Sequence, residues 1–158
     1  MAEEIIKLGK VLGTFSATVG TSGLPRPKVK NLNLIEHYGI ENDKFANDDL
    51  NKTVMIIGIK SYNIAKNHGI NLLYGSYGEN LLFDFDPHEL EVEEILQIND
   101  AIIQIKEKCT LCNHLSVFGK QLPKLIKNHR GLYCKILKSG NIKKNSFVFI
   151  KSNIEKSA

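Results

Sequence analysis

The stretch ILQINDAIIQI at residues 95–105 decides the fold class of this chain. Apolar residues dominate both sides of the polar pair Asn99-Asp100, and they alternate after it. This arrangement predicts a tight turn between two paired strands, although the glycine that such turns favour is missing. The first element we expect is therefore a strand pair, 95–98 with 101–105.

Further strand patterns flank this pair on both sides. Residues 5–19 alternate around two glycines and predict one long or bent strand, which a turn at 21–27 joins to an antiparallel partner at 29–35. Short apolar runs predict four more strands, of which the last two are expected to form a hairpin: 54–59, 81–85, 132–137 and 146–150.

Two segments favour short helices. Ser61 is placed to cap a helix that ends before Gly69, and residues 121–128 have helical spacing. The sequence shows no repeat, linker or low-complexity segment. It predicts one mainly β domain over residues 1–150 with two or three short helices, followed by a frayed polar tail at 151–158.

Composition limits the cellular setting. A chain of 158 residues can bury a sizeable core without disulfides, and its three cysteines are an odd number. No apolar leader follows a basic N-terminus, and no window approaches the roughly 18 apolar residues of a membrane span. We therefore expect a cytoplasmic protein with reduced thiols and no membrane association.

The net charge of +4 owes much to the last third of the chain. This region predicts either a solvated lysine surface or a site for a small anionic ligand such as a phosphorylated cofactor. Nucleic acid is not expected as a partner, because neither a base-stacking pattern nor a helix-turn-helix or zinc-finger spacing is present. The basic residues are Lys120, Lys124, Lys127, Arg130, Lys135, Lys138, Lys143 and Lys144.

Candidate chemistry is concentrated in the run Cys109-Thr-Leu-Cys112-Asn-His114. A thiolate is both a nucleophile and a soft metal ligand, and nearby cations such as Lys108 or a protonated His114 favour it. Cys109 lies three residues before Cys112. The alternative is a pair of buried thiols, since free cysteines often serve as small hydrophobes.

A structural zinc site is a weaker interpretation of the same thiols. Zinc takes nitrogen and sulfur ligands, which Cys109, Cys112 and His114 offer, with Cys134 as the candidate fourth ligand. The second ligand pair lacks the close spacing of zinc ribbons and knuckles, so zinc is not expected. Cys134 lies within an apolar strand pattern and is expected to be a core thiol.

Five short motifs, in order along the chain, resemble the MOSC family, which is named for the C-terminal domain of molybdenum cofactor sulfurases. Glu79 and Asn80 form the most diagnostic pair, and Cys112 matches the family's cysteine. The motifs are Gly39-Ile-Glu-Asn-Asp43-Lys-Phe-Ala46, Tyr77-Gly78-Glu79-Asn80-Leu81, Leu96-Gln-Ile98-Asn-Asp100-Ala, Cys112-x-x-Leu115 and Gly131-Leu-Tyr-Cys-Lys-Ile136.

The resemblance implies a closed or nearly closed β-barrel with the cysteine near one mouth, which would also leave few strand edges exposed. The chain departs from the family pattern in four places. Phe45 stands where many members have histidine, Leu111 where many have proline and Asn99 where many have glycine, and Cys109 is an additional thiol. The loss of the histidine removes any acid-base or metal role at position 45.

The resemblance also implies a function. Cys112 would accept sulfane sulfur from a cysteine desulfurase as a persulfide and pass it to molybdenum cofactor or another metal-sulfur centre. Cys109 would resolve that persulfide by forming a disulfide with Cys112. One alternative makes Cys112 a molybdenum ligand in a reductase of N-hydroxylated compounds, and another is a non-catalytic cofactor-binding module. Pyridoxal phosphate binding and association with a molybdenum enzyme are further properties that the family suggests.

Other polar residues have a structural and a functional interpretation. Asp43 either fixes a turn or contacts ligand, and Glu79 with Asn80 either satisfies backbone groups at a strand end or contacts substrate. Arg130 is suited to bind the phosphate of a pterin cofactor, although a solvent-facing arginine is the commoner outcome. Surface positions are expected for four histidines: His37, His68, His88 and His129.

Overall fold

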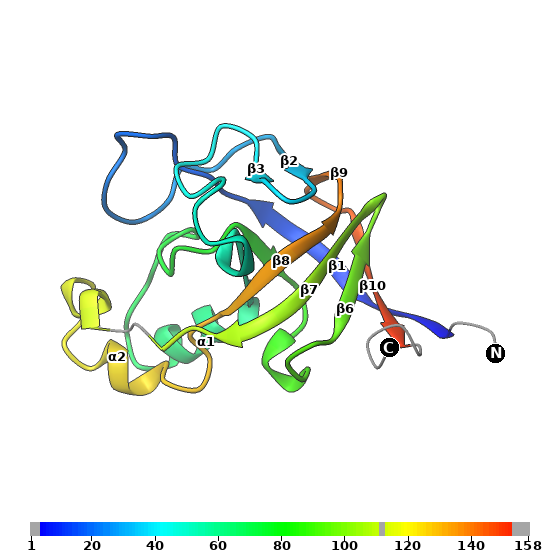
Figure 1. The fold of residues 1–158 in the computed structure, drawn as a ribbon. Helices are drawn as coiled ribbons and strands as arrows, with labels where there is room; N and C mark the ends of the chain where they lie inside the picture. Colours follow the sequence, from blue (N-terminus) through cyan, green and yellow to red (C-terminus); the bar gives the residue numbers. More distant parts are fainter. Residues whose placement is uncertain (1–3, 111–112, 153–158) are drawn as a thin grey trace.

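The computed structural model describes residues 4–110 and 113–152, which fold into a β-barrel with short helices beside it (Figure 1). Within these residues seven strands close the barrel in the order β1-β10-β6-β7-β8-β4-β5. This confirms the predicted fold class. The barrel strands are β1 (Glu4–Thr14), β4 (Val54–Gly58), β5 (Leu81–Phe83), β6 (Ile95–Ile98), β7 (Ala101–Lys108), β8 (Leu132–Lys138) and β10 (Phe147–Ser152).

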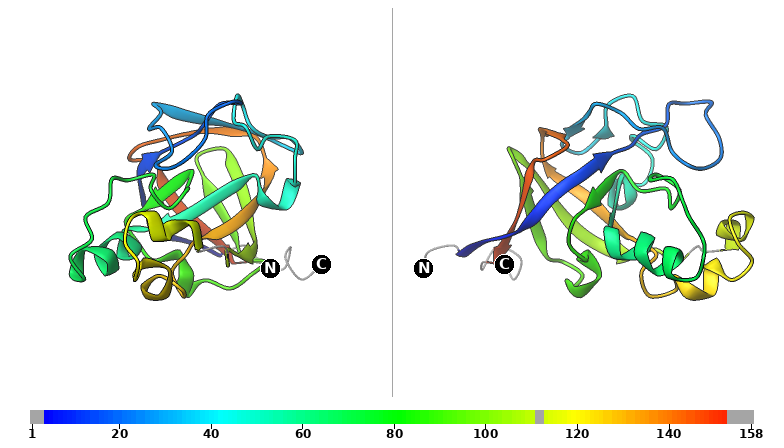
Figure 2. Two further views of the ribbon diagram at one scale, coloured as in Figure 1. Left: turned by 90° about the vertical axis from the view of Figure 1, so that its left-hand side faces the viewer. Right: turned by 180° about the vertical axis from the view of Figure 1, so that it is seen from behind.

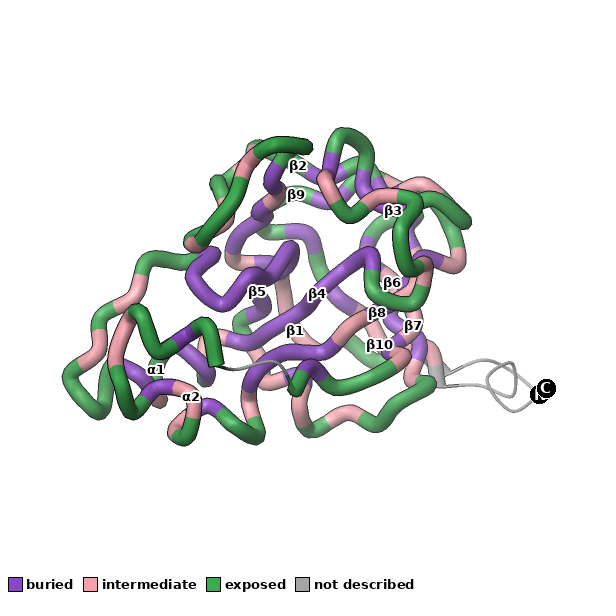
Figure 3. Tube along the Cα trace, turned by 60° about the vertical axis from the view of Figure 1, so that its left-hand side comes forward, coloured by how far each residue is buried: buried purple, intermediate pink, exposed green. Residues whose placement is uncertain are grey.

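The barrel is closed around an apolar core. Strands β7 and β8 alternate between buried and half-buried residues, as strands with one wet face do. All five residues of β4 are buried, because the helical segments cover its outer face. Figure 3 shows this burial concentrated on the barrel strands, with exposed residues in the loops.

Two α-helices lie at the end of the barrel away from the termini (Figures 1 and 2). They are α1 (Ile59–Asn67) and α2 (Leu122–Leu125), accompanied by the 3-10 turns η1 (Leu50–Lys52), η2 (Pro87–Glu89) and η3 (Asn113–Val117). Tyr62, Leu115 and Leu122 belong to a second apolar cluster that joins these segments to the barrel. No helix among the described residues is long and apolar enough to span a membrane.

The helices differ in detail from the prediction. Helix α1 begins two residues before Ser61, so Ser61 does not cap it and instead donates from Oγ to the carbonyl of His129 at 2.7 Å. Gly69 follows the helix with φ +78°, as expected for a glycine beyond a C-terminus. Helix α2 covers only four of the predicted residues, because the chain turns after Leu125.

The predicted pairing of the first two strands is wrong. Strand β1 ends at Thr14, and only an isolated bridge between Phe15 and Lys28 joins the following segment to the approach to the second strand. That second strand, β2 (Asn31–Ile35), lies between β3 (Gly39–Ile40) and β9 (Gly140–Lys143) in a separate three-stranded sheet. The buried leucines of β2 pack on the barrel core. Its partner β9 lies about 100 residues further along the chain, so the local sequence around β2 does not indicate this pairing.

The predicted hairpin of the last two strands is also wrong. β8 pairs with β4 and β7, while β10 pairs with β1 and β6. Strand β9 follows β8 and precedes β10 along the chain, but it pairs with β2 in the three-stranded sheet. β10 runs to Ser152, two residues beyond the predicted end of the domain, and residues 153–158 lie outside the described part of the chain.

The turn at the centre of the fold-deciding stretch is confirmed. β6 pairs with β7 in an antiparallel hairpin, with Ile98 opposite Ala101. Asn99 takes a left-handed conformation with φ 56°, which asparagine tolerates better than most residues. Its amide nitrogen donates to Asn141 O at 3.1 Å and Ser146 Oγ at 2.9 Å, so the side chain anchors a turn that glycine could not.

Candidate functional site

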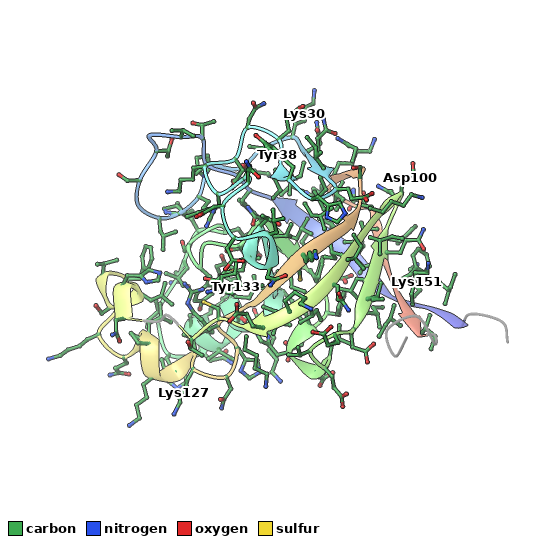
Figure 4. All side chains as sticks on the ribbon, viewed as in Figure 1. Lys30, Tyr38, Asp100, Lys127, Tyr133 and Lys151 are labelled. Atoms are coloured by element: carbon green, nitrogen blue, oxygen red, sulfur yellow. The ribbon has the colours of Figure 1, made fainter. Side chains whose placement is uncertain are left out.

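A cavity of about 300 Å³ opens at the helical end of the barrel, and we call it the mouth cavity. Its described lining contains three cationic side chains and a histidine but no carboxylate, which favours an anionic ligand. Tyr133 lies at the end of β8 near the helices, while Asp100 lies at the far β6–β7 turn (Figure 4). The lining residues are Gly23, Leu24, Arg26, Lys44, Phe45, Met55, Tyr77, Gly78, His114, Arg130 and Tyr133.

Arg130 is buried rather than facing solvent. Its Nη1 donates to the carbonyl of Tyr77 at 2.6 Å, and its Nη2 lies 3.1 Å from His114 Nε2. Because a guanidinium only donates, His114 Nε2 must accept, so this imidazole is neutral with its proton on Nδ1. Partial burial and the charge of Arg130 both lower the pKa of His114. Arg130, not a protonated His114, therefore supplies positive charge here.

Arg26 was missed by the sequence analysis, where it was part of a turn. Its side chain is only 13% exposed, and its Nη1 lies 3.8 Å from Asp43 Oδ1. Nε and Nη1 are buried and have no hydrogen-bond partner among the described residues. Burial lowers the pKa of Arg26, while the charges of Asp43 and Glu79 oppose this. A guanidinium left incompletely satisfied beside a cavity is suited to an anionic ligand.

Asp43 holds this corner together. It accepts hydrogen bonds from Ser16 Oγ at 2.6 Å and from the backbone N–H of Phe45 at 3.0 Å. It does not line the mouth cavity, and its carboxylate is the counter-charge of Arg26. Phe45, which replaces the family histidine, places its ring 4.9 Å from Arg26 Cζ in a cation–π contact.

Glu79 lies in the interior and is fully buried. Its Oε2 accepts from Tyr62 Oη at 2.5 Å and from the Gly75 N–H at 3.0 Å, while Oε1 has no partner within the described residues. Burial raises the pKa of Glu79, against the opposing effect of the Tyr62 hydrogen bond. Glu79 therefore keeps its proton to a higher pH than an exposed glutamate does.

Asn80 satisfies backbone groups at the ends of two strands. Its Oδ1 accepts from Met55 N at 2.9 Å, and its Nδ2 donates to Phe15 O at 3.0 Å. The same residue lines a second cavity of about 200 Å³, which shares Arg26, Phe45 and Tyr133 with the mouth cavity. We call this the side cavity.

The three cysteines fall in different environments. Cys112 and Leu111 lie outside the described residues. Cys109 is buried, its N–H donates to Gly131 O at 2.9 Å and its Sγ donates to Tyr133 Oη at 3.4 Å. Cys134 is fully buried within β8, and this burial raises the pKa of its thiol, so the predicted core thiol is confirmed.

A third cavity of about 540 Å³ lies beyond Arg130, and we call it the outer cavity. It includes Lys108 and Cys109 together with His88, whose side chain is only 7% exposed. The expected surface position of His88 is therefore wrong, because η2 turns this ring toward the backbone of Gly131. Lys108 is exposed and does not line the mouth cavity.

The described residues contain no group of three or more histidine, cysteine or acidic side chains arranged to hold a metal ion. The structure thus brings Arg130, His114 and Arg26 around one cavity. Glu79, Asn80 and Lys108 do not line it: Glu79 is fully buried, Asn80 lines the side cavity and Lys108 lines the outer cavity.

A seven-stranded barrel with a basic mouth beside a cysteine-bearing segment defines the class of protein. The model of the MOSC domain matches residues 37–148, and the chain belongs to this family. No curated protein matches the chain.

Solved structures share the fold. The YuaD protein of Bacillus subtilis has a TM-score of 0.81 at 14% identity, with 96% of this chain and 100% of that chain covered. YiiM of Escherichia coli has a TM-score of 0.66 at 15% identity, covering 91% and 70%. YiiM of Geobacillus stearothermophilus has a TM-score of 0.65 at 16% identity, covering 94% and 76%.

Proposed function

We propose that this MOSC-domain protein binds molybdenum cofactor, or a related anionic ligand, in the mouth cavity and carries sulfur as a persulfide on Cys112. One observation carries the proposal. Arg130 and Gly131 contact the residues on both sides of the Cys112 segment, since Arg130 meets His114 and Gly131 O accepts from the Cys109 N–H. The segment that bears the thiol is thereby tied at both ends to the cationic cavity.

The residues around the cavity fit an anionic, partly planar cofactor. Arg26, Arg130 and Lys44 are suited to phosphate oxygens, and the partnerless donors of Arg26 support a ligand there. Phe45 and Tyr133 line both the mouth and the side cavity and offer apolar surface to a flat ring. When bound, the cofactor would supply the molybdenum centre that receives the sulfur.

Sulfur loading requires a thiolate on Cys112. The thiolate would attack the outer sulfur of a persulfide on a cysteine desulfurase, the S–S bond of the donor would break, and the donor cysteine would leave as a thiolate. Arg130, joined to this segment through His114, provides the charge that favours the anionic nucleophile. A desulfurase and a molybdenum enzyme are thus the proposed partners.

Cys109 suits the role of a resolving thiol better than that of the first nucleophile. Its Sγ is buried and donates to Tyr133, so an incoming donor protein would not reach it readily. Attack by Cys109 on the inner sulfur of the persulfide would form a disulfide with Cys112 and release hydrosulfide. That step conserves electrons without an added oxidant.

A second candidate is a molybdenum-dependent reductase of N-hydroxylated compounds in which Cys112 contacts the metal. The contiguous mouth and side cavities favour it, because their shared aromatic residues provide room for a flat substrate beside a bound cofactor. This candidate predicts molybdenum in protein made in a cofactor-competent host and its loss in Cys112→Ser. Molybdenum retained at the wild-type level in that variant would exclude thiolate ligation.

The carrier is tested by incubating reduced protein with a cysteine desulfurase and cysteine, then measuring intact mass. Wild type and Cys109→Ser are expected to gain sulfur, whereas Cys112→Ser is not. Cys134→Ser is the matched control, because that thiol is fully buried in β8 and should not affect loading. Equal loading of Cys112→Ser and wild type would contradict the carrier role.

A simple binding module would bind its ligand equally well with or without Cys112. Pyridoxal phosphate is a second phosphate-bearing ligand that the cationic lining suits. Its binding is followed by absorbance, and the same Cys112→Ser comparison separates a passive module from a thiol-dependent one.

A further inference from the structure

His88 supports the backbone that organises the mouth cavity. The N–H of Gly131 donates to His88 Nε2 at 2.9 Å, and His88 Nδ1 lies 2.7 Å from Asp86 Oδ1. Because Nε2 accepts, the ring proton resides on Nδ1 and is donated to Asp86. Asp86 also accepts from the backbone N–H of His88 at 3.0 Å, which fixes the ring in this tautomer.

Gly131 needs such support. Its φ of +121° lies in a region that side-chain-bearing residues rarely adopt, and a Cβ there would meet Met55 Sδ at 3.1 Å. On its other side, Gly131 O accepts from Cys109 N–H, so one peptide segment joins His88 to the thiol-bearing chain. The neighbouring Arg130 extends into the mouth cavity.

We propose that His88 is a positioning residue for the mouth cavity: as a neutral acceptor it holds Arg130-Gly131, and through them Cys109 and His114, in the geometry that binds an anion. This inference rests on the proposed anionic site and adds a residue that touches neither ligand nor thiol. Protonation of Nε2 would replace the acceptor with a donor facing the Gly131 N–H, and the contact would be lost.

The groups around His88 include some that raise its pKa and some that lower it. Burial lowers the pKa of His88, the hydrogen bond and charge of Asp86 raise it, and His129 and Lys108 lower it. The net direction is a lowered pKa, so His88 keeps its neutral form to a lower pH than an exposed histidine does. The charged or titratable groups among the described residues that face this ring or share its cavity are Asp86, Glu89, Lys60, Lys108, Cys109, Lys127, His129 and Arg130.

The test uses the full chain and sulfate, a dianion that does not titrate between pH 5 and 8. Binding is followed by the NMR signal of the His114 ring, which lies in the mouth cavity and excludes sulfate bound elsewhere. His88→Ala removes the acceptor, and His88→Gln keeps an oxygen acceptor that cannot become protonated in this range. His68→Ala is the control, because His68 is an exposed histidine whose ring contacts its own helix.

At pH 8 we expect His88→Ala to bind sulfate about tenfold more weakly than wild type, the lower end for loss of an outer supporting partner. His88→Gln should bind within about twofold of wild type at pH 8. As the pH is lowered through the titration of the wild-type His88 ring, followed by its own NMR signal, His88→Gln should come to bind more tightly than wild type, because only wild type loses its acceptor. His114 titrates in both proteins, so their difference isolates His88.

Wild-type affinity in His88→Ala at pH 8, or parallel profiles for His88→Gln and wild type across the titration of the wild-type His88 ring, would overturn the proposal. If His88→Ala fails to fold, the profile of His88→Gln decides alone. If wild type does not bind sulfate, the proposed anionic site fails, and the Gly131 amide signal without ligand decides instead. A Gly131 shift in His88→Gln across that titration that matches wild type would then overturn the positioning role, and its absence would support it.

Discussion

At the residue scale, two guanidinium groups define the candidate site. Arg130 makes hydrogen bonds to Tyr77 and His114, whereas Arg26 has donors without a hydrogen-bond partner among the described residues. Arg130 was identified from the sequence because it stands beside a family motif. Arg26 and His88 were not, because their partners are remote: Arg26 meets Asp43, and His88 meets Gly131. Short-range patterns do not encode a contact between residues tens of positions apart, so only the folded chain shows it.

Arg26 is expected to contribute directly to anion binding. Arg26→Met keeps much of the side-chain volume but removes the charge and the partnerless donors. We predict a loss of about tenfold in sulfate affinity, or ~1.4 kcal/mol. The affinity is measured from the His114 signal at low ionic strength, with the exposed Lys30→Met (Figure 4) as the matched control. Equal affinities for Arg26→Met and Lys30→Met would remove Arg26 from the site.

Glu79 is expected to make stability depend on pH. Burial raises its pKa in the folded state, so the folded state holds the proton more tightly than the unfolded state. Its contribution is therefore fully present below the unfolded pKa, about 4.3, and is lost as pH rises through the folded value. Glu79→Gln should remove this loss. Urea unfolding at pH 5 and pH 8 measures it, and an unchanged pH slope in the variant would contradict a raised pKa for Glu79.

At the scale of elements, the sequence predicted the pairing of strands that are adjacent along the chain but not the pairing of distant strands. The hairpin at 95–105 was predicted because its strands are adjacent and its turn is polar. The partners of β2 and β10 were assigned wrongly, because the sequence showed that these segments are strands but not which strands they join. Closure of a barrel pairs β1 with both β10 and β5, and this arrangement came only from the family resemblance.

Asn80 is expected to hold β4 to the end of β1. Asn80→Ala would leave the Met55 N–H and the Phe15 carbonyl without their side-chain partner in a buried environment. We predict a loss of about 2–6 kcal/mol in unfolding free energy, since each of the two buried groups left unsatisfied costs about 1–3 kcal/mol. Urea denaturation provides the measurement. Asn63→Ala, at an exposed position of α1, is the control, and an equally small effect of both changes would contradict this role.

At the scale of the whole molecule, the residues of the apolar core and the residues of the candidate site lie in different parts of the fold. The apolar barrel supplies a rigid frame, while the loops and turns at its helical end bring Arg26, Arg130 and His114 to one cavity. The extra thiol, Cys109, lies between this cavity and the outer cavity, with Tyr133 on one side and Gly131 on the other. A cysteine segment anchored to a cationic mouth is what the proposed sulfur carrier requires.

The most direct test is a peptide map of desulfurase-treated wild-type protein under conditions that preserve persulfides. Trypsin cleavage after Lys108 and Lys120 places Cys109 and Cys112 in one peptide, while Cys134 falls in another, so fragment masses assign the sulfur to a single thiol. We predict added sulfur on Cys112, or a desulfurase-dependent Cys109–Cys112 disulfide where the resolving step has followed. Sulfur on Cys134, or a 109–120 peptide with neither added sulfur nor that disulfide while the desulfurase turns over, would contradict the carrier role.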